Sequence, residues 1–198
     1  MRVGVMGGTY NPPHIGHLEA GRAVYQALGL DQILFIPTNI PPHKNLPAGT
    51  ATTEQRCEMV RLMVEDCPWA QLSTIEIDRG GASYTVDTLR ALHQTGKYSS
   101  LTLIMGTDML LNFDIIWKSY DEIARLAELA VVGRYTADRA ALEEKAEYLR
   151  KTLGAKIHLI DAPLIEVSST ELREGQDLNR FTVPAVARFI TENHLYHH

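Results

Sequence analysis

Two histidines three residues apart, His14 and His17, close a stretch near the start of the chain that suits phosphate chemistry. The stretch covers residues 3–17 and reads Val-Gly-Val-Met-Gly-Gly-Thr-Tyr-Asn-Pro-Pro-His-Ile-Gly-His. Each imidazole can donate an N–H to a phosphate oxygen, whether it is neutral or charged. Gly7 and Gly8 lack a Cβ, so the backbone there can approach a phosphate closely. We interpret the stretch as a site for a nucleotide phosphate chain.

The elements around this stretch are expected to place both histidines at the start of a helix. Val3, Val5 and Met6 form a short apolar run typical of a strand, and residues 7–9 are expected to turn. From His14 onward, apolar residues recur at helical spacing, at Leu18, Ala20, Ala23, Val24 and Leu28. Side chains three residues apart share one face of a helix, here at the end where unpaired N–H groups and the dipole favour an anion.

The same stretch has plainer interpretations than a phosphate site. A glycine pair after a strand can be only a tight turn, and two histidines at this spacing can bind a metal or lie on the surface. A metal is disfavoured because no cysteine or carboxylate lies near with ligand spacing. The pattern matches neither the P-loop, Gly-x-x-x-x-Gly-Lys-Ser/Thr, nor the dinucleotide motif Gly-x-Gly-x-x-Gly.

Length and composition predict one domain, residues 1–198, with a substantial core, since 45% of the residues are hydrophobic. The formal charge of −5 gives no global attraction for nucleic acid, so phosphate attraction must be local, from Lys44, Arg173 and their neighbours. The two cysteines, Cys57 and Cys67, lack metal spacing and are expected to be reduced thiols in the cytoplasm. Without a signal peptide or an apolar run near 18 residues, no membrane partner is expected.

Strand and helix patterns alternate along the chain. The expected strands are Val3–Met6, Ile33–Pro37, Leu72–Ile77, Leu101–Met105, Ala130–Val132 and Ile157–Ile160. The expected helices are Ile15–Leu28, Thr53–Asp66, Thr85–Gln94, Tyr120–Arg125, Ala137–Leu153 and Val183–Asn193. Thr52 with Gln55 predicts a capping box for the second helix, and Thr182 is expected to cap the last one. The alternation predicts an α/β, Rossmann-like doubly wound fold, a mostly parallel sheet with helices on both faces.

Ligands of such sheets bind at the carboxyl ends of the strands, where the strand order reverses. The glycine turn at residues 7–9 and the turn Gly106-Thr107-Asp108 are both expected at such ends. Residues 38–52 form a long polar loop that contains prolines, which is typical of a functional flap.

The first stretch resembles the signature of the nucleotidyltransferase superfamily with the HIGH motif, which includes small-molecule adenylyltransferases and class I aminoacyl-tRNA synthetases. In the adenylyltransferases the second half of the signature is Ser-Ser-Thr-x-x-Arg. This chain has Ser168-Ser169-Thr170-Glu171-Leu172-Arg173, in a C-terminal portion, about 163–198, that is expected to be helical. From residue 3 to about residue 195 the chain is similar to bacterial nicotinate mononucleotide adenylyltransferases.

Four further features carry that resemblance, each with a plainer alternative. Pro42-His43-Lys44 stands where the family's Pro-His-Lys reaches the nucleotide phosphates, although a loop lysine is usually just solvated. Ser83-Tyr84-Thr85-Val86-Asp87-Thr88-Leu89 matches a segment beside the nicotinate carboxylate, or is only a helix start capped by Ser83 or Thr85. Gly106-Thr107-Asp108 matches the family's Gly-x-Asp, whose carboxylate bonds ribose hydroxyls, or is an ordinary turn. Trp117 stands where the family stacks a tryptophan on the pyridine ring, or is a core residue.

Two positions depart from the family pattern. Lys118 replaces the aromatic residue that often follows the tryptophan, which changes little if only the backbone there contacts the carboxylate. Arg134-Tyr135-Thr136 replaces the usual Arg-Pro-Gly, which leaves the role of Arg134 on the adenine or phosphate side open.

The resemblance implies that ATP and nicotinate mononucleotide give deamido-NAD and pyrophosphate, a step of NAD biosynthesis. A phosphate monoester is already a competent nucleophile, so catalysis reduces to alignment and charge neutralisation. The implied catalytic residues are His14, His17, Lys44 and Arg173. The other implied ATP contacts are Gly7, Gly8, Thr9, Asp108, Arg134, Ser168, Ser169 and Thr170. The implied mononucleotide contacts are Thr9, Tyr10, Asn11, Lys44, Tyr84, Thr85, Thr88, Gly106, Asp108, Trp117 and Lys118.

The same resemblance assigns more detailed roles. His17 would contact the α-phosphate, and Ser169 with Thr170 would cap the helix that holds the β- and γ-phosphates. Mg²⁺ is expected to arrive with ATP, because no carboxylate cluster is arranged to hold it.

Three alternative functions are less consistent with the sequence. Adenylyltransferases for pantetheine phosphate are usually shorter and lack the Ser-Tyr-Thr and tryptophan features. A class I synthetase fragment would need a Lys-Met-Ser-Lys-Ser loop and a tRNA-binding domain. A nucleotide sensor without catalysis need not keep His14, His17, Lys44 and Arg173 together.

Overall fold

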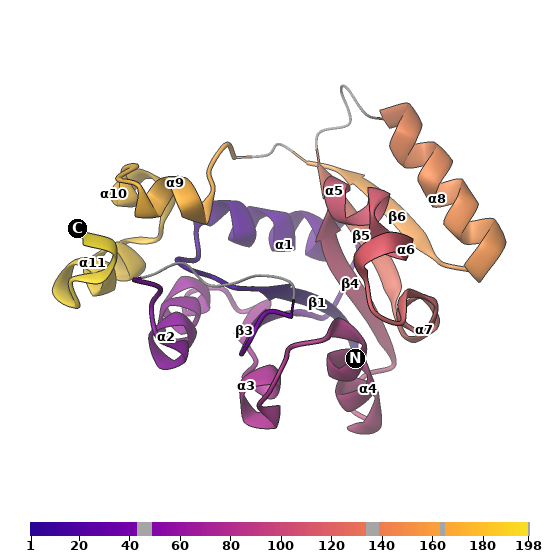
Figure 1. Ribbon diagram of the computed structural model, residues 1–198, viewed down its shortest axis with the longest axis horizontal. Helices are drawn as coiled ribbons and strands as arrows, with labels where there is room; N and C mark the ends of the chain where they lie inside the picture. Colours follow the sequence, from indigo (N-terminus) through magenta and orange to yellow (C-terminus); the bar gives the residue numbers. More distant parts are fainter. Residues whose placement is uncertain (43–48, 134–138, 163–164, 198) are drawn as a thin grey trace. The chain divides into compact units, whose positions relative to one another are not determined.

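The computed structural model of the chain describes residues 1–42, 49–133, 139–162 and 165–197 (Figure 1). Within this part of the chain the strands form a six-stranded sheet in the order β3-β2-β1-β4-β5-β6. The strands are β1 (Arg2–Gly8), β2 (Gln32–Pro37), β3 (Ala70–Leu72), β4 (Ser100–Gly106), β5 (Glu128–Gly133) and β6 (Ile157–Asp161). The order reverses direction between β1 and β4, which is the pattern of a doubly wound fold. The predicted Rossmann-like α/β class is confirmed.

The helices of the described residues vary from single turns to four turns. They are α1 (Ile15–Leu28), α2 (Thr53–Val64), α3 (Ile75–Arg79), α4 (Thr85–Gln94), α5 (Thr107–Leu111), α6 (Phe113–Ile116), α7 (Tyr120–Leu126), α8 (Arg139–Leu153), α9 (Ser169–Arg173), α10 (Leu178–Phe181), α11 (Pro184–Glu192) and the 3₁₀ turn η1 (Leu195–His197).

The chain packs as two compact units, each assembled from three segments. The first unit comprises Met1–Met6, Ala20–Ile33 and Tyr84–Leu164. The second unit comprises Gly7–Glu19, Leu34–Ser83 and Ile165–His198.

In the first unit, parallel pairing joins β1 to β4, β4 to β5 and β5 to β6. Residues 101–105 of β4 and 129–133 of β5 are buried without interruption. Strands of this kind read as continuous apolar runs because helices cover both faces of the sheet. Figure 1 shows α1 on one side of β1 and β4, and α4 on the other.

In the second unit, α2 packs against α11. The predicted capping box at the start of α2 is confirmed. The side chain of Thr52 accepts from the backbone N–H of Gln55 at 3.2 Å. The side chain of Gln55 in turn accepts from the backbone N–H of Thr52 at 2.9 Å. The buried face of the helix consists of Arg56, Met59, Val60, Met63 and Val64.

Several local predictions are wrong. Ile75–Arg79 forms helix α3 where the sequence predicts the end of a strand, because Thr74 Oγ1 bonds Asp78 Oδ2 at 2.8 Å and supports an i,i+4 turn. Val183, not Thr182, precedes the first residue of α11. The hydroxyl of Thr182 donates instead to the carbonyl of Leu178, at 2.7 Å.

Two expected turns also differ. Gly7 and Gly8 extend β1, and Thr107 with Asp108 opens helix α5 directly after β4. Gly7 and Gly8 are therefore positioned by the strand itself, and Thr107 and Asp108 by the helix that directly follows β4.

Candidate functional site

A pocket of about 330 Å³ brings the histidine stretch and the Ser-Ser-Thr-x-x-Arg motif together in the second unit. This volume is at the lower end of the range for small-molecule sites. The pocket is lined by Thr9, Tyr10, Asn11, His14, His17, Val167, Ser168, Ser169, Thr170 and Arg173. All but Val167 are residues that the sequence assigns to the candidate site.

The two histidines are organised by the start of α1. His14 is the last residue before the helix, and the backbone N–H of His14 donates to Nδ1 of His17 at 3.2 Å. This bond fixes the proton of neutral His17 on Nε2, because Nδ1 is the acceptor. The two ring centres are 3.7 Å apart. Nδ1 of His14 is buried without a hydrogen-bond partner among the described residues.

Both histidines are neutral in the absence of a ligand. Burial lowers the pKa of His14 to about 4, against a smaller opposing effect of the Glu171 carboxylate. Burial also lowers the pKa of His17 well below its usual value, and the neighbouring His14 adds to this effect. Each ring therefore offers one N–H without carrying a charge, and an anion bound beside them would raise both pKa values.

Three glycines of the stretch serve different purposes. A Cβ on Gly8 would lie 3.1 Å from the ring of Tyr10, and one on Gly16 would lie 2.9 Å from Nδ1 of His14. These glycines therefore make room for the site's own rings. A Cβ on Gly7 would meet no atom within 4 Å, so Gly7 is the position where the backbone borders open space.

Tyr10 is a buried residue whose ring packs against His17. Its ring is 1% exposed and packs edge-on against His17, with 4.9 Å between ring centres. Burial, reinforced by the carboxylate of Glu76, raises the pKa of Tyr10, so the hydroxyl stays protonated.

Helix α9 begins with a capping box that the sequence analysis missed. Ser168 is the N-cap residue: its hydroxyl accepts from the backbone N–H of Glu171 at 3.2 Å, while the Glu171 carboxylate accepts from the backbone N–H of Ser168 at 2.8 Å. The expectation that Ser169 and Thr170 cap this helix is therefore wrong. The Ser-x-x-Glu spacing is the signal that identifies Ser168.

The remaining side chains of the motif bind other parts of the pocket. The hydroxyl of Ser169 donates to the carbonyl of Pro12 at 2.8 Å. Arg173 donates through Nη1 to the carbonyl of Asn11 at 2.6 Å and through Nη2 to Thr170 Oγ1 at 3.1 Å. The guanidinium is thus fixed at the pocket wall by the loop that follows β1.

A buried arginine outside the predicted set also holds that loop. Arg56 of α2 is 1% exposed and donates to the carbonyls of Thr9, at 2.9 Å, and Thr38, at 2.8 Å. It joins the residue after β1 to the residue after β2. A charged residue on the otherwise apolar face of an amphipathic helix, near Met59 and Val60, is the sequence signal that could have identified it.

The expected carboxylate end of the mononucleotide site lies in the first unit. Tyr84 is the N-cap residue of α4, and no side chain caps the helix, so neither Ser83 nor Thr85 is the cap. The ammonium of Lys118 lies 4.1 Å from the centre of the Tyr84 ring, a cation–π contact. Thr88 is buried, and its hydroxyl donates to the carbonyl of Tyr84 at 3.4 Å.

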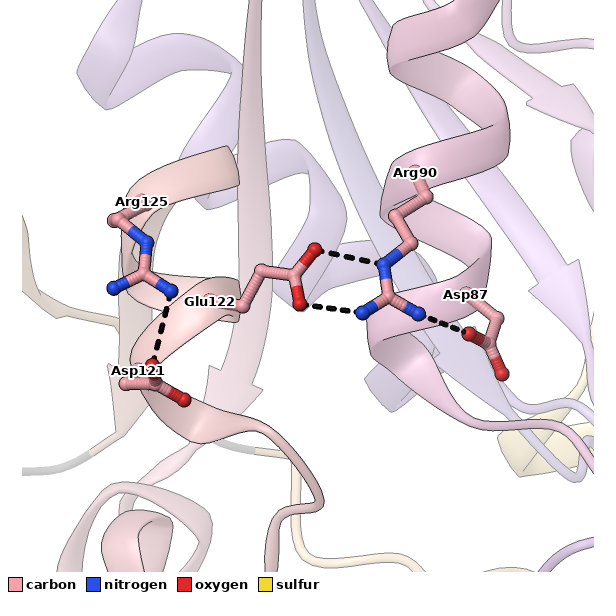
Figure 2. A network of polar contacts seen from close by, with 5 residues as sticks. All are labelled: Asp87, Arg90, Asp121, Glu122 and Arg125. Carbon is pink, nitrogen blue, oxygen red and sulfur yellow. Dashed lines mark hydrogen bonds and ion pairs between the residues drawn. The ribbon is translucent and has the colours of Figure 1, made fainter.

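Figure 2 shows how α4 is tied to α7, the helix that follows Lys118. Arg90 of α4 bonds the carboxylate of Glu122 through Nε and Nη2, and that of Asp87 through Nη1. Exposed ion pairs add little stability, but a two-pronged guanidinium–carboxylate pair fixes orientation. Arg90 also offsets the charge of Asp87, which would otherwise oppose an anion at the start of α4.

Three more expected contacts lie in the first unit. Gly106 ends β4, and the exposed carboxylate of Asp108, in the first turn of α5, has no hydrogen bond to the described residues. The ring of Trp117 lies 5.7 Å from that of Phe113. Its buried Nε1 has no hydrogen-bond partner in the described part of the chain.

Two expected site residues, Lys44 and Arg134, lie outside the described residues. Among the residues that are described, no three histidines, cysteines or acidic residues gather as metal ligands would. No described helix has the length and apolar character needed to cross a bilayer.

The chain is similar to known proteins along nearly its whole length. Residues 5–175 match the family model described as cytidylyltransferase-like. The probable nicotinate-nucleotide adenylyltransferase of Geotalea daltonii is 35% identical, and the match covers 99% of this chain and 98% of the relative. That of Lactiplantibacillus plantarum is also 35% identical, over 98% of this chain and 88% of the relative.

A solved structure supports the fold. Plasmodium falciparum nicotinic acid mononucleotide adenylyltransferase, complexed with NaAD, superposes with a TM-score of 0.77 over 99% of this chain and 97% of its own. The two sequences are 16% identical, so this likeness concerns the fold alone.

Proposed function

We propose that this chain, which belongs to the nicotinate-nucleotide adenylyltransferases within the cytidylyltransferase-like family, transfers the adenylyl group of ATP to nicotinate mononucleotide. The products are deamido-NAD and pyrophosphate, in a step of NAD biosynthesis. The observation that carries the proposal is the pocket of the second unit, where neutral imidazole donors and a fixed guanidinium lie together.

The reaction needs little from the protein beyond placement and charge. An oxygen of the mononucleotide 5′-phosphate attacks the α-phosphorus of ATP. The bond from that phosphorus to the oxygen that bridges the α- and β-phosphates breaks. Pyrophosphate leaves with the electron pair, and no proton has to be removed from the nucleophile. Donors aimed at the developing charge are therefore the main catalytic requirement.

The side chains of the pocket divide this task. We assign Nε2–H of His17 to the α-phosphate, since Nδ1 is occupied by the backbone. His14 and Arg173 are assigned to the β- and γ-phosphates, with the backbone N–H groups of Gly7, Gly8 and Thr9 near the joining phosphates. Lys44 is assigned to the same phosphates by the sequence motif alone. The imidazoles can donate while neutral and gain a proton when the anion arrives.

Mg²⁺ belongs to the proposal as the ion that arrives with ATP and neutralises the triphosphate. The protein is assigned no metal ligand of its own. Such an ion keeps several of its waters and binds the substrate phosphates.

The ring end of the mononucleotide is assigned to the first unit. The start of α4 offers backbone N–H groups without a side-chain cap, and the Lys118 ammonium adds a positive charge beside Tyr84. Donors and a cation favour a carboxylate over an amide, whose NH₂ would leave one donor unpaired. We therefore expect nicotinate mononucleotide to be preferred over nicotinamide mononucleotide by at least about tenfold in kcat/KM.

The remaining expectations also belong to the proposal. Asp108 is assigned to the ribose hydroxyls and Trp117 to stacking on the pyridine ring. The chain is expected to act as a single nucleotidyltransferase domain in the cytoplasm, with no nucleic acid partner.

Pyrophosphate release tests the proposal directly. The chain is mixed with Mg-ATP and, in separate reactions, with nicotinate mononucleotide, nicotinamide mononucleotide or pantetheine phosphate. We expect rapid release with the first substrate and at least tenfold lower kcat/KM with the second. Preference for pantetheine phosphate would assign the chain to another adenylyltransferase. ATP binding without release in any mixture would make it a sensor.

A further inference from the structure

Asn11 lies where the three segments of the second unit meet, and its side chain is buried. Its Oδ1 accepts from the backbone N–H of Ala51 at 3.2 Å and from the hydroxyl of Tyr196 at 2.7 Å. Its Nδ2 donates to Thr50 Oγ1 at 3.2 Å, and its backbone carbonyl accepts from Arg173 at 2.6 Å. Both acceptor positions of the side-chain amide are therefore used within the protein.

Tyr196 is built into this arrangement from the far end of the chain. It is 7% exposed and has a φ of 60°, a left-handed conformation that residues other than glycine adopt at a cost. Burial raises the pKa of its hydroxyl, against the opposing charges of Arg173 and Arg56. The hydroxyl therefore keeps its proton and acts as the donor to Asn11.

The backbone at Asn11 and Pro12 contacts both the first and the last residue of α9. The carbonyls of Asn11 and Pro12 are consecutive, and they accept from Arg173 and Ser169 respectively. A rotation of this short segment would shift both contacts at once. Any group that holds the Asn11 side chain therefore holds the arginine at the pocket wall.

We propose that Tyr196 is a positioning residue for adenylyl transfer, which holds the Asn11 loop and, through the Asn11 carbonyl, the guanidinium of Arg173. The inference rests on the proposed function in one respect, the assignment of Arg173 to the triphosphate. It makes the C-terminal turn part of the ATP site, although Tyr196 does not line the pocket.

The first test removes only the hydroxyl. In Tyr196→Phe we expect the Kd for Mg-ATP, measured by calorimetry without mononucleotide, to rise about tenfold, with an equal fall in kcat/KM for ATP. The KM for nicotinate mononucleotide should stay within about twofold. Unchanged ATP affinity, or an equal loss for both substrates, would overturn the proposal.

A matched control separates positioning from general stability. Thr182 also has a buried hydroxyl in the second unit, and it donates to the carbonyl of Leu178 away from the pocket. Thr182→Val should lower the melting temperature without changing the Kd for Mg-ATP. If both variants weaken ATP binding in proportion to their loss of stability, Tyr196 is merely structural.

A double variant tests whether Tyr196 acts on ATP binding through Arg173. Arg173→Lys removes the forked contacts to Asn11 and Thr170, so adding Tyr196→Phe should change the Kd for Mg-ATP by less than about twofold. A further tenfold loss in the double variant would show that the two residues act independently and would overturn the proposed route.

The unmodified protein provides a test that does not depend on the folding of any variant. Because coupling is reciprocal, Mg-ATP should slow amide hydrogen exchange at residues 194–197. Unchanged exchange at saturating Mg-ATP would contradict the proposal. Binding of ATP without pyrophosphate release refutes only the proposed function, because the binding measurements still decide the role of Tyr196. Absence of ATP binding refutes both.

Discussion

Replacement of Arg56 by methionine should be among the most damaging single changes in the second unit. Methionine keeps most of the length of the stem but removes every donor, which leaves the carbonyls of Thr9 and Thr38 without the guanidinium. An unsatisfied buried acceptor costs about 1–3 kcal/mol, so these two, which belong to half-buried residues, cost at most about 2–6 kcal/mol together. Part of this is offset because a charge need no longer be buried. We expect a net loss of about 2–4 kcal/mol.

Arg61 provides the control on the same helix. Its guanidinium is exposed and pairs with Glu58 and Glu65, and such surface pairs contribute at most about 1 kcal/mol. Urea unfolding of Arg56→Met and Arg61→Met, with thermal melting in parallel, measures the difference. For a chain of this size, the melting temperature of the Arg56 variant should be roughly 4–16 °C below that of the unmodified protein. A difference of less than about 0.5 kcal/mol between the two variants would refute the reasoning.

Three further predictions concern the ligand site. His17→Ala should lower kcat by roughly 10²–10³ with a smaller effect on the KM for ATP, and near-normal kcat would remove His17 from the chemistry. Trp117→Ala should weaken both mononucleotides equally in kcat/KM, because stacking does not distinguish a carboxylate from an amide; a changed ratio would contradict this role. The pKa of His14 is lowered in the folded chain, so the unfolded chain takes up the proton first as the pH falls. Stability should therefore drop between about pH 6.5 and pH 4, by at most about 3 kcal/mol from this group. His14→Asn should reduce that slope in urea unfolding, and an equal slope would contradict the assignment.

The histidine stretch and the Ser-Ser-Thr-x-x-Arg motif could be predicted as site residues, because phosphate binding requires particular residue types. A strand end, glycines without a Cβ and a helix start with histidines form a pattern that is visible in sequence. The Ser-x-x-Glu spacing at Ser168 was equally visible, although the sequence analysis assigned the cap to the next two residues. The alternation of strands and helices also predicted the class of fold, since buried parallel strands are apolar throughout.

The supporting residues could not be predicted in the same way. Arg56 and Tyr196 act on the backbone carbonyl of Thr9 and on a side-chain amide at Asn11, far away in the chain. Every residue has a backbone carbonyl, so the partner of Arg56 leaves no signature of residue type, and the partner of Tyr196 lies 185 residues away along the chain. Helix α3 is not predicted for a related reason: its alternating polar and apolar residues also suit a strand, whereas the bond of Thr74 to Asp78 favours the helical turn.

The contacts of Asn11 also follow an order in time. Its partners Thr50 and Ala51 leave the ribosome early, but the hydroxyl of Tyr196 is 185 residues away along the chain. At about 5–20 residues per second, synthesis of that interval takes roughly 10–40 s. During this period the loop after β1 is made but cannot yet complete its hydrogen bonds. The nascent chain therefore has to carry its phosphate-binding segment without this hydrogen bond until Tyr196 has been synthesised.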